Sequence, residues 1–328
     1  MADVLRILAA TDFSAAADRA SWRAASIAST DGGMLHLAHV PPPQELLAQI
    51  LPKPKGVEGL RAFAEKALEA RAERIGSHFG TTPICHIVQG RAHEAVLAAA
   101  ESVQAGLLVL GAQGEREGVL SSNTVGDTAL KSAERSPVPV LLVRREAQEQ
   151  YAHVIGCVKG DRADPIVVRW TSRMSPDDLL HILHVYTVPY ERRLREWGAS
   201  QATLDVYATR ERDQRIQKLS ALLEQIGLPA ARARLHVDRG EPLSTILQKA
   251  AEWRADLLVM GRRRGTDSLA PGPMGNVARD LALAAPVDVM IVPPASASQL
   301  DRVAPQDERS PPLRPPQSSL RRSHSGNV

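Results

Sequence analysis

Short, continuously apolar runs alternate along the chain with longer segments in which apolar residues recur every three or four positions. The short runs are typical of β-strands buried on both faces, and the longer periodic segments are typical of amphipathic α-helices. The first half of the chain therefore predicts strands at 4–10, 34–40, 84–88, 107–111 and 138–143, with helices at 15–29, 58–79, 92–103 and after Gly126.

The second half repeats this order of elements. It predicts strands at 153–158, 179–185, 235–237, 257–260 and 287–292, with helices after Pro165, across 191–226, at 243–253 and after Gly275. Matching landmarks recur 145 to 150 residues apart, which indicates a duplication. The matched pairs are Leu35 with Leu180, Gly90 with Gly240, Gly111 with Gly261, and Gly126 with Gly275.

Alternating strands and helices predict βαβ crossovers. We therefore expect an α/β fold of two doubly wound parallel-sheet domains in tandem, of the Rossmann-like or flavodoxin-like kind. The first domain is expected at residues 1–148 (repeat 1) and the second at 149–294 (repeat 2). Residues 295–328 are rich in Pro, Ser and Arg and poor in apolar side chains, so we expect a disordered tail.

Composition narrows the classes of partner. Aromatic residues make up only 3% of the chain, which removes most of the rings on which single-stranded nucleic acids stack, and the net charge is only +3. No apolar run approaches the roughly 20 residues of a membrane span. We expect no nucleic-acid partner, no membrane partner and a cytoplasmic location. Cys85 and Cys157 lack metal-binding spacing and are expected to be reduced core residues.

In each repeat an apolar strand ends at a glycine, a glycine-bearing loop follows, and a further glycine opens a helix. The glycines are Gly111, Gly114 and Gly126 in repeat 1, and Gly261, Gly265 and Gly275 in repeat 2. A glycine loop that leads into a helix N-terminus presents unpaired backbone N–H groups and the positive end of the helix dipole, which suit a phosphate. The pattern favours a nucleotide, although the glycines could serve only tight turns and close packing.

Several separated motifs support a family assignment. They are the strand end Ala9-Ala10-Thr11-Asp12-Phe13-Ser14, a Leu-His-x-x-His-Val second strand, a Leu-x-Val-x-Gly fourth strand, the glycine loop and a Pro-Val-x-Val final strand. Over roughly residues 3–294 the chain resembles a tandem universal stress protein, whose domain is also described as adenine-nucleotide α-hydrolase-like. The resemblance implies an adenine-nucleotide ligand. It also implies that the strands at 138–143 and 287–292 join the repeats across a pseudo-twofold interface, as family dimers do between chains.

In repeat 1 the resemblance implies contacts on both sides of the nucleotide. Thr11 and Asp12 would contact the adenosine moiety, Val40 would lie beside the base, and Gly111, Gly114 and Gly126 would surround the phosphates. The interval from Gly114 to Gly126 is two residues longer than in the family pattern G-x2-G-x9-G-[ST], and Asp127 replaces the final Ser or Thr. A carboxylate there would repel phosphate unless Mg²⁺ bridges them or Thr128 supplies a donor. The expected cofactor is ATP, with or without Mg²⁺, and no tightly bound metal is expected.

In repeat 2 the residues implied for the nucleotide or phosphate are Val185, Gly261, Gly265, Gly275 and Asn276. Lys159 stands where repeat 1 has Asp12, and a lysine cannot accept a hydrogen bond from a ribose hydroxyl. The cationic run at residues 262–264 is expected to be a solvated loop, with phosphate contact as the alternative. Another phosphate-bearing ligand is therefore an open alternative for repeat 2.

The histidines of the second strands and the tryptophans are expected to serve structural roles. His36, His39, His181 and His184 are expected to be structural, because residues three apart on a strand face opposite sides and cannot converge on one ion. The four tryptophans, Trp22, Trp170, Trp197 and Trp253, are scattered singly and are expected to be packing residues.

Neither a P-loop nor a nucleophile-elbow or HExxH motif occurs, and we assign no catalytic residue. The sequence favours a stress-response protein that binds ATP or a related adenine nucleotide as a regulatory ligand. Two alternatives remain open, a nucleotide-free protein-interaction module with degenerate loops and a slow ATPase or autophosphorylating protein. The protein partner is not identified by the sequence, and association of two chains is left open.

Overall fold

The computed structural model describes residues 4–42, 54–113, 125–147, 150–161, 163–175, 179–262 and 274–294. Within these ranges the elements follow the order expected from the sequence. The elements of repeat 1 are β1 (Arg6–Thr11), α1 (Ala15–Asp31), β2 (Met34–His39), α3 (Pro54–Phe79), β3 (Ile84–Ile87), α4 (Ala92–Ser102), β4 (Leu107–Gly111), α5 (Asp127–Arg135) and β5 (Val140–Val143).

Repeat 2 has the same order, with one additional short helix. Its elements are β6 (Val154–Val158), α6 (Asp164–Met174), β7 (Leu180–Tyr186), α7 (Glu191–Glu196), α8 (Gln201–Gln225), the 3-10 turn η1 (Ala230–Arg232), β8 (Ala233–Arg239), α9 (Pro242–Glu252), β9 (Leu257–Gly261), α10 (Asn276–Ala284) and β10 (Asp288–Val292). No helix among these described residues is both long and apolar enough to cross a bilayer.

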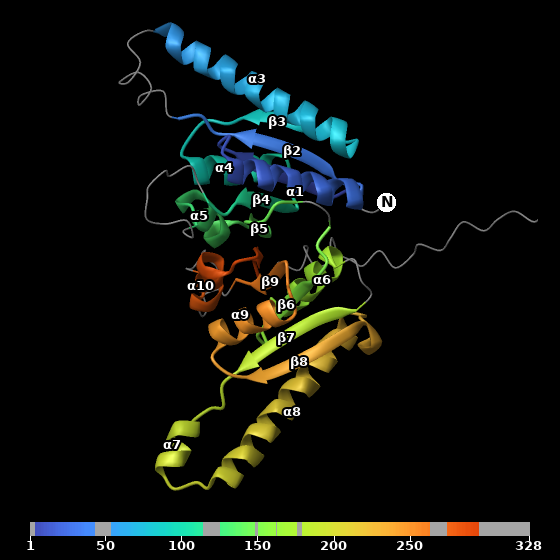
Figure 1. Ribbon diagram of the computed structural model, residues 1–328, viewed down its shortest axis with the longest axis vertical. Coiled ribbons are helices and arrows are strands. Elements are labelled where there is room, and N and C mark those ends of the chain that lie inside the picture. Colours follow the sequence, from blue (N-terminus) through green and yellow to red (C-terminus); the bar gives the residue numbers. More distant parts are fainter. Residues whose placement is uncertain are drawn as a thin grey trace, which may run out of the picture.

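The described strands form one continuous sheet in the order β3-β2-β1-β4-β5-β10-β9-β6-β7-β8 (Figure 1). Pairing is parallel within each repeat, whereas β5 and β10 pair antiparallel, with Leu142 opposite Val289 and Val140 opposite Ile291. The predicted α/β fold with parallel strands in each repeat is confirmed. The prediction that the final strands of the two repeats meet within the chain is also confirmed.

Helices cover both faces of this sheet. One apolar cluster joins the sheet to α1, α3, α6 and α8, and a second joins its opposite face to α4, α5, α9 and α10. The central strands are buried along almost their whole length, as expected for parallel strands covered on both sides. Because β5 and β10 lie at the centre, each apolar cluster runs without interruption from repeat 1 into repeat 2.

The long helix expected at 191–226 is interrupted, so that α7 and α8 are separate. Gly198 adopts a left-handed backbone with φ of 87°, which ends α7, and the Ser200 hydroxyl then accepts a hydrogen bond from the Thr203 N–H to cap α8. In Figure 1, α7 and the start of α8 project away from the sheet. Trp197 lies at this break and is 77% exposed, so its interpretation as a packing residue was wrong.

Both cysteines are unpaired, but only one of them lies in the core. Cys157 in β6 is buried, and burial raises the pKa of its thiol to about 12. Cys85 is exposed, because β3 is an edge strand and only one of its sides is paired. The expectation of two core cysteines was therefore wrong for Cys85.

Candidate functional site

The carboxyl ends of β1 and β4 in repeat 1, and of β6 and β9 in repeat 2, are the places where the strand order reverses. From β1 the chain continues to β2 on one side of it, while β4 and β5 lie on the other side. Open α/β sheets bind ligands at such points, beyond the carboxyl ends of the strands. Most of the site residues expected from the sequence lie at one of these two points.

In repeat 1, a short polar turn connects β1 to α1. The Thr11 hydroxyl accepts a hydrogen bond from the Phe13 N–H, and the Asp12 carboxylate accepts one from the Ser14 N–H at 3.0 Å. The Ser14 hydroxyl in turn caps α1 by accepting from the Ala17 N–H. The Asp12 side chain thus helps to order the turn and remains exposed at the strand end.

Phe13 was not identified from the sequence as a site residue, yet it fixes this turn. Its backbone is left-handed, with φ of 68°, which is uncommon for a residue with a bulky side chain. The Phe13 ring stacks on His39, with 4.2 Å between the ring centroids, and the Arg71 guanidinium lies 4.6 Å from the centroid of the Phe13 ring. Arg71 also donates a hydrogen bond to the Phe13 carbonyl and pairs with Asp18, so that α3 holds the turn in place. The long sequence separation of Phe13 and Arg71 left no local signal for this contact.

The phosphate side of repeat 1 lies where β4 meets α1 and α5. A Cβ atom on Gly111 would lie 2.8 Å from the Ala16 backbone, so only glycine permits this close approach. The Gly126 N–H donates to the Ala112 carbonyl, which anchors the start of α5 beside the end of β4. Gly126 occupies the N-cap position and provides no side-chain cap.

Two polar side chains expected near the phosphates occupy the first turn of α5. The Asp127 carboxylate forms an ion pair with Lys131 at 2.6 Å, and Thr128 is half-buried. Val40 follows His39, the last residue of β2. Because His39 pairs with Thr11, Val40 lies near the carboxyl end of β1. Gly114 lies outside the described residues.

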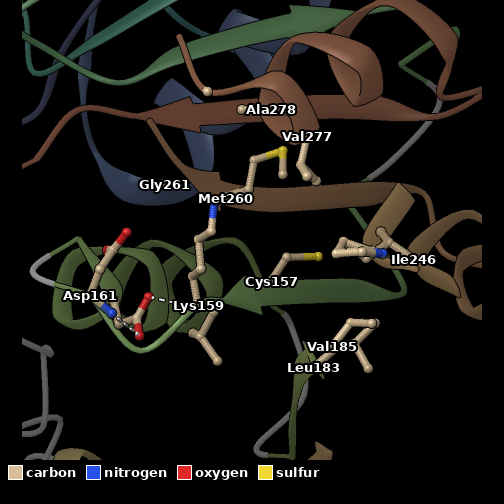
Figure 2. A pocket seen from close by; sticks show the side chains of 14 residues that line it. Cys157, Lys159, Asp161, Leu183, Val185, Ile246, Met260, Gly261, Val277 and Ala278 are labelled. Atoms are coloured by element: carbon tan, nitrogen blue, oxygen red, sulfur yellow. Dashed lines mark hydrogen bonds between the residues drawn. The ribbon is translucent and has the colours of Figure 1, made fainter. Parts of the chain in front are cut away.

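In repeat 2, a mostly apolar pocket lies at the ends of β6 and β9 (Figure 2). Three residues expected from the sequence line it, namely Val185, Gly261 and Gly275. The Lys159 side chain extends from the end of β6 toward Met260 and Gly261. Asn276 is the exposed first residue of α10, and Gly265 lies outside the described residues.

The backbone donors after β6 are already occupied by a side chain of the same repeat. The Asp164 carboxylate accepts hydrogen bonds from the N–H groups of Lys159, Gly160 and Asp161, at 3.0, 2.6 and 3.1 Å. Burial raises the pKa of Asp164 to about 6, against the opposing effect of these hydrogen bonds. One signal for this role is visible in the sequence, because Asp164 precedes a proline at the start of a predicted helix, where capping carboxylates are common.

Arg262, the first arginine of the 262–264 run, contacts repeat 1. Arg262 is buried, and its guanidinium donates to the carbonyl groups of Ala133 and Glu134 at the C-terminal end of α5. Cations are favourable at that end of a helix dipole. The expectation of a solvated Arg262 was therefore wrong, and residues 263 and 264 lie outside the described residues.

The histidines of the second strands have structural contacts. His39 donates to the Thr11 carbonyl at 2.8 Å, and His184 donates to the Val158 carbonyl at 3.0 Å, so each fixes the end of the neighbouring strand. His36 is hydrogen-bonded to His86 on β3, and burial together with His86 lowers the pKa of His36. Among the described residues, no group of three or more His, Cys, Asp or Glu side chains could hold a metal ion.

Comparison with solved structures supports this arrangement of the sheet. The crystal structure of a universal stress protein from Archaeoglobus fulgidus is 15% identical in sequence, covers 88% of this chain and 98% of its own, and gives a TM-score of 0.61. A functionally unknown protein from Pseudomonas aeruginosa PAO1 is 14% identical, covers 92% and 96% of the two chains, and gives a TM-score of 0.54. At these identities the likeness concerns the fold.

Sequence comparison identifies the family. A universal stress protein of Thermus aquaticus, named for its position in the 3' region of a QAH/OAS sulfhydrylase, is 34% identical over 138 residues, which are 42% of this chain and 97% of that protein. The model of the universal stress protein family matches this chain twice, at residues 4–144 and 150–293. The chain therefore belongs to the universal stress protein family and carries two of its domains in tandem.

Proposed function

We propose that this universal stress protein binds ATP or a related adenine nucleotide through repeat 1, and that the nucleotide acts as a regulatory ligand. The observation that carries the proposal is the exposed Asp12 carboxylate at the same sheet edge as Gly111 and the N-terminus of α5. A carboxylate accepts hydrogen bonds from ribose hydroxyls, and a helix N-terminus attracts phosphate.

The first turn of α5 supports a phosphate at repeat 1. Its N-cap is Gly126, which contributes no side chain to satisfy the first N–H groups of the helix. Asp127 is held along the helix by Lys131 and lies beside the proposed phosphates. Asp127 would help to hold a Mg²⁺ ion beside the phosphates, and the charge of that ion would offset the repulsion between the two anionic groups.

The same chemistry disfavours adenosine at repeat 2. Lys159 replaces the carboxylate with a group that only donates hydrogen bonds, and Asp164 already accepts from the backbone N–H groups that follow β6. The pocket there is lined largely by apolar side chains such as Met260 and Ile246. We therefore propose a division of roles, in which repeat 1 is the nucleotide site and repeat 2 completes the fold.

Regulation would act through α5. Nucleotide binding at its N-terminus would fix the position of this helix, whose C-terminal carbonyl groups contact Arg262 of repeat 2. A nucleotide-dependent surface presented to a protein partner in the cytoplasm is the role that we propose for the ligand.

Isothermal titration with ATP tests the proposal, in the presence and absence of Mg²⁺. We expect the intact chain to bind ATP more tightly with Mg²⁺. Asp12→Ala should weaken binding by about 10-fold or more, since it removes the charged group that would accept a hydrogen bond from the ribose. Lys159→Ala is the matched variant at the same position of repeat 2 and should bind ATP as the intact chain does. Absence of heat at millimolar ATP would show that the protein is a nucleotide-free module.

A further inference from the structure

The pocket of repeat 2 is small, and its interior is aliphatic. It lies where β6, β9 and the N-terminus of α10 meet, and its volume is about 70 Å³ (Figure 2). Its apolar wall includes Leu183, Val185, Ile246, Met260 and Val277, and no aromatic ring lies among its described lining residues. Because pockets for drug-sized ligands hold about 300 Å³ or more, this interior has room for a short aliphatic group only.

The turn after β6 brings two opposite charges to this pocket, the Lys159 amine and the Asp161 carboxylate. Both residues are exposed, and in Figure 2 both side chains extend from the turn toward the same side. Within the described part of the chain neither charge forms an ion pair, although the two residues are only two positions apart. One Asp161 carboxylate oxygen accepts a hydrogen bond from the Ala163 N–H at 2.9 Å, so the second oxygen remains available to a ligand.

Asp164, the other carboxylate of the pocket, has a structural role. It is buried and accepts hydrogen bonds from the backbone N–H groups of Lys159, Gly160 and Asp161, which fixes the turn that carries the two exposed charges. On the opposite side of the pocket, Gly275 is the N-cap of α10 and provides no side-chain cap. The positive end of that helix dipole favours an anionic group near Lys159.

A positive and a negative group that are held apart on one turn are complementary to a zwitterion. An α-amino acid carries its carboxylate, its ammonium group and its side chain on one carbon atom, so an aliphatic pocket between the two charges can receive all three. A phosphate is less suited, because the carboxylates of Asp161 and Asp164 would repel it.

We propose that this pocket binds a small aliphatic α-amino acid, such as valine or leucine. Lys159 binds the carboxylate of the ligand, Asp161 binds its ammonium group, and the wall formed by residues such as Ile246 and Met260 surrounds its side chain. This inference goes beyond the proposed nucleotide function, because it gives repeat 2 a ligand of its own in addition to its part in the fold.

Isothermal titration of the full-length chain with L-valine and with L-leucine tests the proposal. We expect at least one of them to bind at millimolar concentrations. Lys159→Met and Asp161→Asn should each weaken that binding by about 10-fold or more, through loss of a charge-assisted contact. Lys66→Met, which changes an exposed lysine on α3 in repeat 1, is the matched control and should leave the titration unchanged.

Two analogues of valine assign the two charges. 3-Methylbutanoate lacks the ammonium group and isobutylamine lacks the carboxylate, so each should bind the intact chain about 10-fold more weakly than valine does. Asp161→Asn should abolish the preference for valine over 3-methylbutanoate, and Lys159→Met should abolish the preference over isobutylamine. A variant that only disturbs the fold would weaken all three ligands alike.

Absence of binding by both amino acids would overturn the proposal, and so would binding that both variants leave unchanged. Equal binding of valine and its two analogues would overturn it as well. ATP titration of the same proteins keeps this result separate from the nucleotide proposal, because Lys159→Met should lose valine and retain ATP. A chain that binds valine and fails to bind ATP would contradict the nucleotide proposal alone.

Discussion

The two repeats share one topology, yet the residues at the ends of their first strands, β1 and β6, differ in chemistry. In repeat 1, Asp12 is exposed and a neutral Ser14 caps the following helix. In repeat 2, Lys159 takes the place of Asp12, and the buried Asp164 occupies the backbone N–H groups of the turn. The difference shows that strand order and glycine placement are kept while the residues beyond β1 and β6 differ, and we propose that those residues set which ligand each repeat can bind.

The close approach of β4 to α1 in repeat 1 is made to backbone atoms, whereas the matching approach in repeat 2 is made to a side-chain atom. In Gly111→Ala the new Cβ would meet the Ala16 backbone at 2.8 Å, which cannot move without shifting α1. We expect a loss of about 3 kcal/mol in the free energy of unfolding, at the upper end for overpacking. At Gly261 the nearest atom is the Ala163 Cβ at 2.7 Å, just before α6 begins, and Gly261→Ala should cost about 1–2 kcal/mol. Urea unfolding of both variants measures the two losses in the free energy of unfolding. Equal losses would contradict the expected difference between the repeats.

Asp164 in the turn after β6 should make a pH-dependent contribution to stability that has no counterpart in the turn after β1. Burial raises the pKa of this carboxyl from 3.8 to about 6, so the folded state binds a proton more tightly than the unfolded state does. Its contribution to stability is therefore greatest below pH ~4 and falls as the pH rises to ~6, by roughly 2 kcal/mol.

Urea unfolding of the intact chain and of Asp164→Asn across this pH range measures that contribution. The stability advantage of the intact chain over the variant should shrink between pH ~4 and ~6, because other titrating groups cancel in the difference. An advantage that grows with pH would mean that the three N–H hydrogen bonds outweigh burial and that the direction of the pKa shift is wrong.

Much of this comparison could be predicted from the sequence. The order of the elements and the duplication follow from apolar periodicity and glycine spacing. The pairing of the final strands was implied by the resemblance to the family. Lys159 was also recognised as a departure at the strand end. The contact of Arg262 with Ala133 could not be predicted, because it joins residues 129 positions apart across the interface of the repeats. The exposure of Trp197 depends on a helix break at Gly198 that the apolar pattern does not show.

The smallest expected effect on stability concerns the turns that follow β1 and β6. Phe13 has a left-handed backbone with φ of 68°, held by His39 and Arg71, whereas repeat 2 has Gly160 in its turn with φ of 87°. Gly160→Ala should therefore destabilise the protein by about 1 kcal/mol, because alanine disfavours this conformation. Thermal unfolding by circular dichroism checks this value. An unchanged or raised melting temperature would show that the turn of repeat 2 relaxes without cost.

We propose that the nucleotide site belongs to repeat 1 alone. Native mass spectrometry of the full-length chain with ATP and Mg²⁺ tests this proposal, since it counts the nucleotides bound to each chain. We expect one ATP per chain, lost in Asp12→Ala and retained in Lys159→Ala. Two nucleotides per chain, or a single nucleotide that persists in Asp12→Ala, would contradict it.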